Sequence, residues 1–405
     1  MEGLEIYIVG IPSKGIEGIT KEGRDIIEEC DVVFSSERFY KHLILFNVTK
    51  DKLKRFPEKL THLPEEILKI KSGKVCVLAT GDPNFFGITN FLKRHFPENI
   101  IKIIPAISIM QEAFSRLHKN WEDSGFLSIH GRNKEELLPF LLKHKKGFIY
   151  TSNSTDAIFL LKYLKELRLS DYTVYIFEHL GTEKEKITKV NYPYYVKEQI
   201  ADLNVLLFER EAFPSEYIGL GLEDESFEQE KGMITKKEFR SIVISLLQLK
   251  PGVILWDIGA GTGSVSIEAM FNPLGVLAYA IEKNEKAILN MKKNIEKYKA
   301  VNVIPLFSDF KDVVSSIPKP HRIFIGGSGG EIEEVLNIAY DCLLDRGIIV
   351  APAVSIDTLN ALINFCKKHS LDYELTGLTA IRGKKVKKNM LFDTQNTIFL
   401  IRIKK

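Results

Sequence analysis

The sequence predicts a two-part α/β protein, in which a first half of alternating strands and helices precedes a second half that forms a doubly wound sheet. At 405 residues the chain is too long for one ordinary domain and long enough for two or three cores. Apolar runs of strand length alternate with segments of helical periodicity, which is typical of α/β folds. In the second half, a buried strand, a glycine-rich turn and a helix follow one another over residues 253–271. This arrangement binds ligands at the carboxyl edge of a sheet.

Composition and charge exclude several classes of protein. Hydrophobic residues make up 45% of the chain and charged residues 27%, as in soluble globular proteins. The 56 basic and 53 acidic residues leave a net charge of +3, which is too small to indicate nucleic-acid binding. No apolar stretch reaches the roughly 18 residues of a membrane span, and the amino terminus resembles a first strand and not a signal peptide. We therefore expect a cytoplasmic protein without a nucleic-acid or membrane partner.

The cysteines do not predict a metal site or a disulfide. The four of them are widely scattered, with no CxxC pair and no histidine at ligand spacing: Cys30, Cys76, Cys342 and Cys366. Such residues are typical of buried thiols in a reducing compartment.

The first half is predicted to span residues 1–212, with subdomains at about 1–115 and 120–212. In the first subdomain we expect strands at 4–11, 31–34, 75–79 and 101–104, separated by helices. The strand at 75–79 ends at a Gly-Asp-Pro turn, and the strand at 101–104 passes through Pro105 into a helix.

The second subdomain is predicted to continue the alternation. We expect a strand from Phe126, helices at 134–143 and 154–167, strands at 147–152 and 173–180, and a last strand ending near Arg210. This order implies largely parallel sheets in the first half.

Residues 213–232 are acidic, lack a long apolar period and are predicted to be a connector. From residue 233 to 405 the pattern restarts with helices at 235–248, 284–297, 331–343 and 357–368 between strands, and ends in a β-hairpin. Because the connector is polar and no motif is shared, we expect the two halves to work independently.

The turn after the strand at 253–256 carries the clearest ligand signal. Asp257 ends the strand, and Gly259, Ala260, Gly261, Thr262 and Gly263 follow in a GxGxG pattern. Only glycine lets the backbone turn sharply while leaving room for a ligand. Glu282 ends the next strand about 20 residues later, where a nucleotide ribose is normally held.

The GxGxG spacing and the acid before it resemble motif I of the class I S-adenosylmethionine-dependent methyltransferases. A sulfonium ligand has no pyrophosphate, so it gains little from a phosphate cradle and more from nearby carboxylates.

Taken together, the two halves resemble the decarboxylating precorrin C5,15-methyltransferases of corrin-ring synthesis. The first half is similar to the tetrapyrrole methylases through the runs GDPNFFGI, PAISIMQ, SIHGR and EHLGTEKEKI. The second half is similar to the C15-methylating, decarboxylating subunit through GMITKKEFR, WDIGAGTGSVSIEAM, AIEKN and FIGGSGG. The resemblance implies a tetrapyrrole methylase fold followed by a Rossmann-like class I methyltransferase domain.

The resemblance also implies the cofactor and its contacts. One S-adenosylmethionine is expected in each half, two per chain, with no metal. In the second half the matching positions are Thr235, Asp257, Gly259, Ala260, Gly261, Thr262, Gly263, Glu282, Asp309, Gly326 and Gly327. In the first half they are Gly10, Gly81, Asp82 and Ala106. The first loop departs from the family pattern, because Pro12 stands where a second glycine is usual, and proline fixes φ and removes an amide donor.

The expected substrate is a precorrin or cobalt-precorrin, methylated at carbons 5 and 15 and decarboxylated at the acetate on carbon 12. Its acetate and propionate groups favour cationic partners. The candidates are His130, Arg132, Arg240 and Arg382, the last in a basic run, RGKKVKK, that we expect to form a loop. A homo-oligomer is expected.

Two alternatives remain open at this point. The first half, with Pro12, could bind or scaffold tetrapyrrole while only the second half is catalytic. The chain could instead be an RNA or protein methyltransferase, although IGGSGG stands where amino-methylating enzymes carry a D/N-P-P-Y/F signature.

Overall fold

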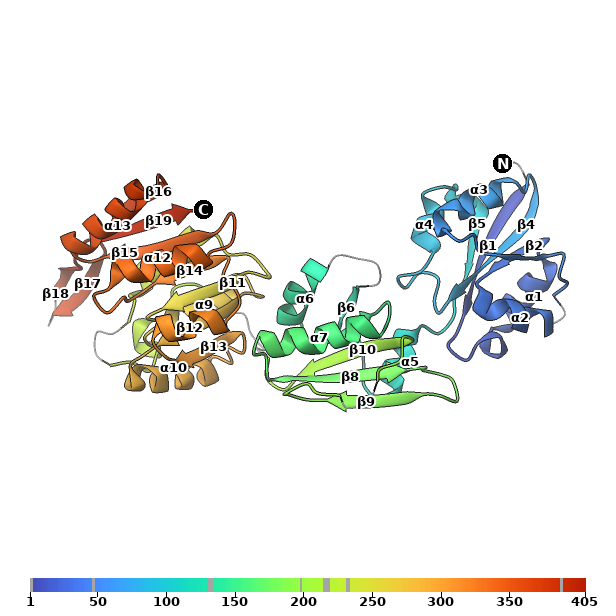
Figure 1. Cartoon of the computed structure of the whole chain (residues 1–405), viewed down its shortest axis with the longest axis horizontal. Coiled ribbons are helices and arrows are strands. Elements are labelled where there is room, and N and C mark those ends of the chain that lie inside the picture. Colours follow the sequence, from blue (N-terminus) through green and yellow to red (C-terminus); the bar gives the residue numbers. More distant parts are fainter. Residues whose placement is uncertain are drawn as a thin grey trace.

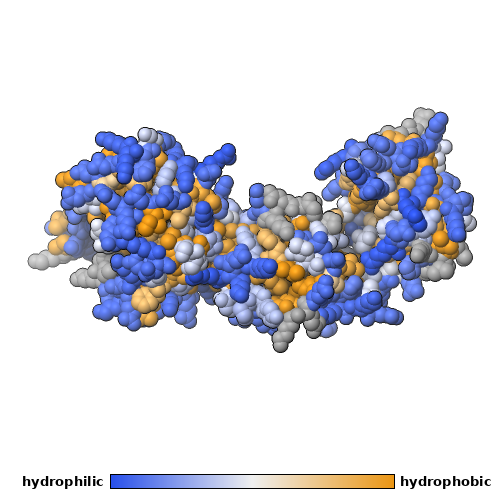
Figure 2. All heavy atoms as spheres, viewed as in Figure 1, coloured by the Kyte–Doolittle hydropathy of each residue, from blue (hydrophilic) through white to orange (hydrophobic). Residues whose placement is uncertain are grey.

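The computed structural model describes residues 3–45, 48–129, 134–196, 199–213, 219–230, 234–386 and 389–405. Three α/β lobes lie in a row, with the amino-terminal and carboxyl-terminal lobes at opposite ends (Figure 1). The α/β class and the order of the two predicted folds are confirmed. Hydrophilic side chains cover most of the two end lobes in the view of Figure 2, and apolar atoms show over the middle lobe. Within the described residues, no helix is long and apolar enough to cross a membrane.

The first lobe is built on a parallel sheet of five strands in the order β3-β2-β4-β1-β5. Buried β-branched and aromatic residues fill both faces, as parallel strands require. The strands are β1 (Leu4–Ile11), β2 (Val32–Ser35), β3 (Leu53–Arg55), β4 (Gly73–Thr80) and β5 (Ile101–Ile104). The helices are α1 (Lys21–Glu29), α2 (Glu37–Leu45), α3 (Leu63–Leu68), α4 (Thr89–Lys93) and α5 (Ile109–Arg116), with 3₁₀ turns at Ile16–Gly18, Leu60–His62 and Glu98–Ile100.

The middle lobe has a second five-stranded sheet, in the order β6-β7-β10-β8-β9. Its strands are β6 (Gly125–Ser128), β7 (Lys146–Tyr150), β8 (Tyr172–Glu178), β9 (Lys186–Val190) and β10 (Asn204–Arg210). Its helices are α6 (Leu137–Lys143) and α7 (Ser154–Glu166), with a 3₁₀ turn at Lys134–Glu136.

The expectation of a largely parallel sheet was wrong for this lobe. Only β6 and β7 pair in parallel, whereas β10 runs antiparallel to both β7 and β8. The reason lies after β8, where the sequence turns directly into β9 as a hairpin. No helix crosses over there, and a hairpin can join only antiparallel strands.

The third lobe contains a seven-stranded sheet in the order β13-β12-β11-β14-β15-β19-β16, the doubly wound arrangement that was expected. All neighbours are parallel except β19, which runs antiparallel to β15 and β16. The strands are β11 (Ile254–Ile258), β12 (Leu277–Glu282), β13 (Val303–Phe307), β14 (Arg322–Ile325), β15 (Ile348–Ala353), β16 (Asp372–Leu378) and β19 (Ile398–Lys404).

Helices cover both faces of this sheet, and successive residues of β11 point to opposite faces. Ile254 and Trp256 pack in one core, and Leu255 packs in the other. The helices are α8 (Lys237–Leu246), α9 (Ser264–Phe271), α10 (Glu285–Lys297), α11 (Phe310–Val313), α12 (Ile332–Cys342) and α13 (Ile356–Lys368), with 3₁₀ turns at Asp224–Ser226 and Val314–Ser316.

The basic run forms a strand and not the loop that we expected. β17 (Ile381–Val386) pairs antiparallel with β18 (Asn389–Thr394), so residues Arg382 to Lys385 lie in a two-stranded ribbon. The ribbon projects beside the main sheet at one end of the molecule (Figure 1).

Residues 219–230 of the expected connector pack against the third lobe. Phe227 is buried in one of its cores, and Asp224 is only 2% exposed. The Glu268 carboxylate of α9 accepts hydrogen bonds from the backbone amides of Gly221 and Leu222 at 2.9 and 3.0 Å. This part of the chain therefore belongs structurally to the second half.

The middle and third lobes also meet directly. Arg210 donates a hydrogen bond to Asn302 Oδ1 at 2.8 Å, and both side chains are buried. The Tyr279 hydroxyl donates to the Leu167 carbonyl oxygen at 3.0 Å, and one apolar core runs through both lobes. The two halves are thus joined by direct contacts as well as by the connector, whose polarity was one reason to expect that they work independently.

Candidate active site

The glycine turn forms the floor of a cavity at the carboxyl edge of the third sheet. β11 ends at Ile258, and α9 begins at Ser264. Gly259, Gly261 and Gly263 all have positive φ values, of 68°, 56° and 75°. A Cβ at Gly259 would lie 2.7 Å from the Gly327 nitrogen, so the loops after β11 and β14 can approach only because residue 259 is glycine.

This second-half cavity has a volume of about 670 Å³ and lies where the strand order reverses between β11 and β14. That position is the usual ligand site of a doubly wound sheet. The structure brings nine of the predicted positions together in its wall: Thr235, Gly259, Ala260, Gly261, Thr262, Glu282, Asp309, Gly326 and Gly327.

Two acids of the wall are held in place by backbone amides. Glu282 accepts a hydrogen bond from Gly261 at 2.9 Å through one oxygen and from Asn284 at 2.8 Å through the other. Asp309 caps α11 by accepting from Lys311, and it pairs with Lys283 at 3.1 Å. The hydrogen bond from the Lys311 backbone amide and the hydrogen bond from the Lys283 ammonium lower the pKa of Asp309 below its usual value. Each carboxylate oxygen can accept a further hydrogen bond.

A buried hydroxyl in the cavity wall can also form a hydrogen bond with a ligand. Thr262 is only 3% exposed, and its hydroxyl has no hydrogen-bond partner among the described residues. A buried unpaired hydroxyl costs free energy unless something binds it. The cavity, the glycine turn over residues 259–263 (here called the glycine cradle) and the unpaired Thr262 hydroxyl together fit a nucleoside-sized cofactor.

Asp257 and Gly263 lie behind this wall. Asp257 is fully buried on the α9 side of β11, where Ser266 Oγ donates to its carboxylate at 2.7 Å. Burial is the main cause that raises the pKa of Asp257 to about 7, with a smaller contribution from the charge of Glu282. A direct cofactor contact by Asp257 therefore stays a prediction.

A smaller cavity, of about 160 Å³, lies between the first two lobes. The Gly81-Asp82 turn after β4 forms one side, and Tyr150, Thr151 and Asn204 of the middle lobe form the other. Of the four predicted positions, Gly81 and Asp82 line the cavity. Gly10 and Ala106 lie next to Gly81, because a Cβ at Gly10 would lie 2.6 Å from the Gly81 carbonyl oxygen and 2.8 Å from the Ala106 Cβ.

The loop with Pro12 forms an ordered turn at the edge of this first-half cavity. The Pro12 carbonyl oxygen accepts a hydrogen bond from the Gly15 amide at 2.9 Å. Ser13 lines the cavity, and its hydroxyl donates to the Glu112 carboxylate of α5. Proline is therefore accommodated without loss of the turn.

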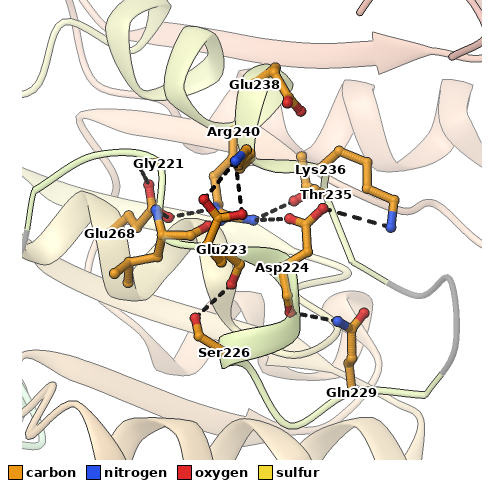
Figure 3. Close-up of polar contacts among 12 residues, drawn as sticks. Gly221, Glu223, Asp224, Ser226, Gln229, Thr235, Lys236, Glu238, Arg240 and Glu268 are labelled. Atoms are coloured by element: carbon orange, nitrogen blue, oxygen red, sulfur yellow. Dashed lines mark hydrogen bonds and ion pairs between the residues drawn. The ribbon is translucent and has the colours of Figure 1, made fainter. Parts of the chain in front are cut away.

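The arginines expected to bind substrate carboxylates are already bound to acids of the chain, so this expectation was wrong for Arg240. Arg240 is fully buried, with Nε donating to Glu268 at 2.6 Å and Nη1 approaching Asp224 at 3.3 Å (Figure 3). Sequence alone could not show this, because its acidic partners come from the presumed connector and from α9.

Arg382 belongs to the same network. It binds Glu238 of α8 through two nitrogens, at 3.0 and 2.5 Å, and Asp224 at 3.2 Å. The Glu238 bonds are the main cause that raises the pKa of Arg382. His130 and Arg132 lie outside the described residues.

Three basic residues at the cavities were missed. Lys236 and Lys283 line the second-half cavity, and Arg38 lines the first-half cavity. A signal for Lys236 existed, because it follows Thr235 directly in the sequence. Arg38 on α2 had no such signal, because only the fold brings it to the Gly81 turn.

Comparison with known proteins agrees with this arrangement. Residues 5–193 match the family model described as tetrapyrrole (corrin/porphyrin) methylases, and residues 225–405 match the model described as a precorrin methyltransferase domain. A precorrin-6Y C(5,15)-methyltransferase (decarboxylating) from Sinorhizobium sp is 29% identical over 363 residues, which covers 89% of this chain and 87% of that protein.

Two shorter relatives each align with less than half of the chain. One is a probable cobalt-precorrin-6B C(15)-methyltransferase (decarboxylating) from Pyrobaculum calidifontis, 34% identical over 46% of this chain and 96% of that protein. The other is a probable cobalt-precorrin-7 C(5)-methyltransferase from Methanocaldococcus jannaschii, 34% identical over 45% of this chain and 87% of that protein.

Proposed function

Since the chain belongs to the family of decarboxylating precorrin-6Y C5,15-methyltransferases, we propose that it methylates carbons 5 and 15 of a precorrin or cobalt-precorrin macrocycle and removes carbon dioxide from the acetate on carbon 12. The family uses S-adenosylmethionine. Two molecules per chain, one in each cavity, are part of this proposal.

The single observation that supports the proposal most is the composition of the second-half cavity. Its wall combines a glycine cradle with the carboxylate of Glu282 and the free hydroxyl of Thr262. In this proposal Glu282 binds the ribose hydroxyls and Asp309 binds the adenine amine, and both residues line the cavity. When bound, S-adenosylmethionine supplies an electrophilic methyl group on a positively charged sulfur.

The chain itself contributes alignment. The network of Arg240 and Glu268 holds the segment before α8, because Arg240 also donates to the Thr235 carbonyl oxygen at 2.5 Å. Thr235 is thereby fixed at the cavity wall. Holding two reactants in alignment can lower a barrier by about 7 to 11 kcal/mol in favourable cases.

The first-half cavity supports a second cofactor by a different construction. Gly10 leaves no room for a Cβ beside the Gly81 carbonyl oxygen, and Gly81, at φ 71°, lines the cavity. Asp82 lines the cavity. One of its carboxylate oxygens accepts a hydrogen bond from the Asn84 backbone amide at 2.7 Å, which orients the Asp82 carboxylate. We assign carbon 5 to this half and carbon 15 with decarboxylation to the other.

Mass spectrometry tests the proposal directly. The full chain is incubated with S-adenosylmethionine and with metal-free or cobalt-containing precursor in parallel. We expect a product that is two methyl groups heavier and one carbon dioxide lighter from one of the two. A product with only one added methyl group, or an unchanged precursor in both reactions, would refute it.

A further inference from the structure

The corrected positions of Arg240 and Arg382 change which cation is available to a substrate at the second site. Both guanidinium groups are bound to carboxylates of the chain, so neither can take up another without leaving an acid unpaired. Two lysines, Lys236 and Lys283, also line the second-half cavity.

Of these two, Lys283 is already paired. Its ammonium lies 3.1 Å from Asp309, on the side of the cavity that we assign to the cofactor. Within the described residues, Lys236 has only one ion pair, and it is a long one, to Asp224. Its nearest acid is Asp224 at 3.8 Å, beyond hydrogen-bond distance, and Asp224 already binds Arg240 and Arg382.

Lys236 is also held where it can reach a ligand. It is the residue before α8, its side chain is 33% exposed, and its backbone follows Thr235, whose carbonyl oxygen is bound by Arg240. In Figure 3 the Lys236 ammonium extends away from the Arg240 side chain, and a dashed line marks its ion pair with Asp224. The network therefore fixes the backbone next to Lys236, while the ammonium keeps only its long ion pair with Asp224.

The same cavity has an apolar rim. Val354, just after β15, lines the cavity and is 76% exposed, and Ile356 beyond it is 77% exposed. Exposed apolar side chains at a cavity mouth are typical of ligand-binding edges. A flat conjugated ring with carboxylates on its periphery needs both an apolar contact and a cation.

We propose that Lys236 binds a carboxylate side chain of the macrocycle at the second site, while Val354 contacts the face of the ring. Lys236 is a substrate-binding residue that positions the ring against the cofactor cavity. This inference rests on the function proposed above.

The test compares two adjacent lysines in the full chain. Lys237 lies on the same helix end, but its ammonium binds Glu223 at 2.6 Å and does not line the cavity. Lys236→Met should raise KM for the macrocycle by about tenfold or more, as expected for a lost charge-assisted hydrogen bond. Lys237→Met should leave KM within about twofold of the wild type.

Further measurements separate substrate binding from a structural role. We expect Lys236→Met to keep S-adenosylmethionine affinity and carbon 5 methylation, and Lys236→Arg to recover most of the lost affinity for the macrocycle. A wild-type KM in Lys236→Met, an equal rise in Lys237→Met, or a parallel loss of cofactor affinity would overturn the inference.

The outcomes also separate this inference from the proposed function. If the wild-type chain makes the doubly methylated product and Lys236→Met does so with an unchanged KM, the inference alone fails. If the wild-type chain neither binds nor methylates either precursor, the proposed function fails and the inference fails with it.

Discussion

The two cavities of this chain are built in different ways. The second-half cavity, of about 670 Å³, lies at the edge of a single sheet and has walls from the loops after its own strands. The first-half cavity, of about 160 Å³, takes one wall from the first lobe and the other from the middle lobe. A site within one sheet is shaped by that sheet, whereas a site between two sheets depends on how they are held together.

The difference extends to the charges around the cavities. Beside the second cavity, Arg240, Glu268 and Asp224 form a buried network whose members come from α8, α9 and the segment before them. At the first cavity, the Ser13 hydroxyl donates to the Glu112 carboxylate, a contact that is only partly buried. We therefore expect substitutions near the second cavity to affect stability more than equivalent ones near the first.

The largest expected effect is that of Arg240→Met. The substitution leaves the buried carboxylate of Glu268 without its cation and removes one of the two arginines bound to Asp224, which should lower the free energy of unfolding by about 3 to 5 kcal/mol. Urea unfolding followed by Trp256 fluorescence in a Trp121→Phe background would report on the second half. Arg382→Met is the control, because Arg382 is partly exposed and should cost about 1 kcal/mol. Equal losses in the two variants would contradict the role of burial.

Gly259→Ala should abolish cofactor binding in the second half only. The added Cβ would clash with Gly327 and strain a residue at φ 68°, so we expect affinity there to fall by about a hundredfold. The product should then carry one new methyl group and keep its carboxyl group. Gly330→Ala is the matched control, because it has φ 94° but open space around its Cβ. Loss of both methylations in a folded Gly259→Ala protein would argue against two separate sites.

Gly10→Ala is the corresponding change at the first cavity. A Cβ there would press on the Gly81 carbonyl oxygen and on Ala106, and movement of the two loops can relieve part of the clash. We expect about a tenfold loss of carbon 5 methylation with carbon 15 methylation retained, measured by product mass on each precursor. Gly15→Ala in the same loop has open space around its Cβ but a φ of 82°, so it adds backbone strain without the clash and should have little effect on either reaction.

The smallest expected effect concerns Asp257 and pH. The unfolded carboxyl titrates near 3.8 and the folded one near 7, because burial disfavours its charge. Between these values the folded chain holds a proton that the unfolded chain has lost, so this group lowers stability as pH rises to about 7. Asp257→Asn removes the charge and should raise the free energy of unfolding by about 1 kcal/mol at pH 8, with no gain at pH 4. A gain that does not depend on pH would show that the carboxyl is not the cause.

Much of this arrangement could be predicted from the sequence. The order of strands and helices in the third lobe follows from apolar periodicity, and the spacing of the glycines in the turn after β11 is enough to mark the cavity. The antiparallel middle sheet could not be predicted as easily, because β9 (KITKV) is short and mostly exposed and resembles a loop.

The substrate-facing charges were the least predictable part. Nothing in the sequence indicated that Arg240 and Arg382 bind acids of the chain. Only the packing of residues 219–230 onto α8 and α9 showed the acids that bind them. Conversely, Lys236 gained its importance from the absence of a close partner among the described residues, a property of the fold and not of any motif.

The central claim is that one chain carries two working cofactor sites of unequal construction. Isothermal titration of the full chain with S-adenosylmethionine, with Gly259→Ala and Gly10→Ala in parallel, tests it most directly. We predict two molecules bound per wild-type chain and one per chain for Gly259→Ala, with Gly10→Ala weakening only the other site. A single site per wild-type chain that Gly259→Ala removes entirely would contradict the claim.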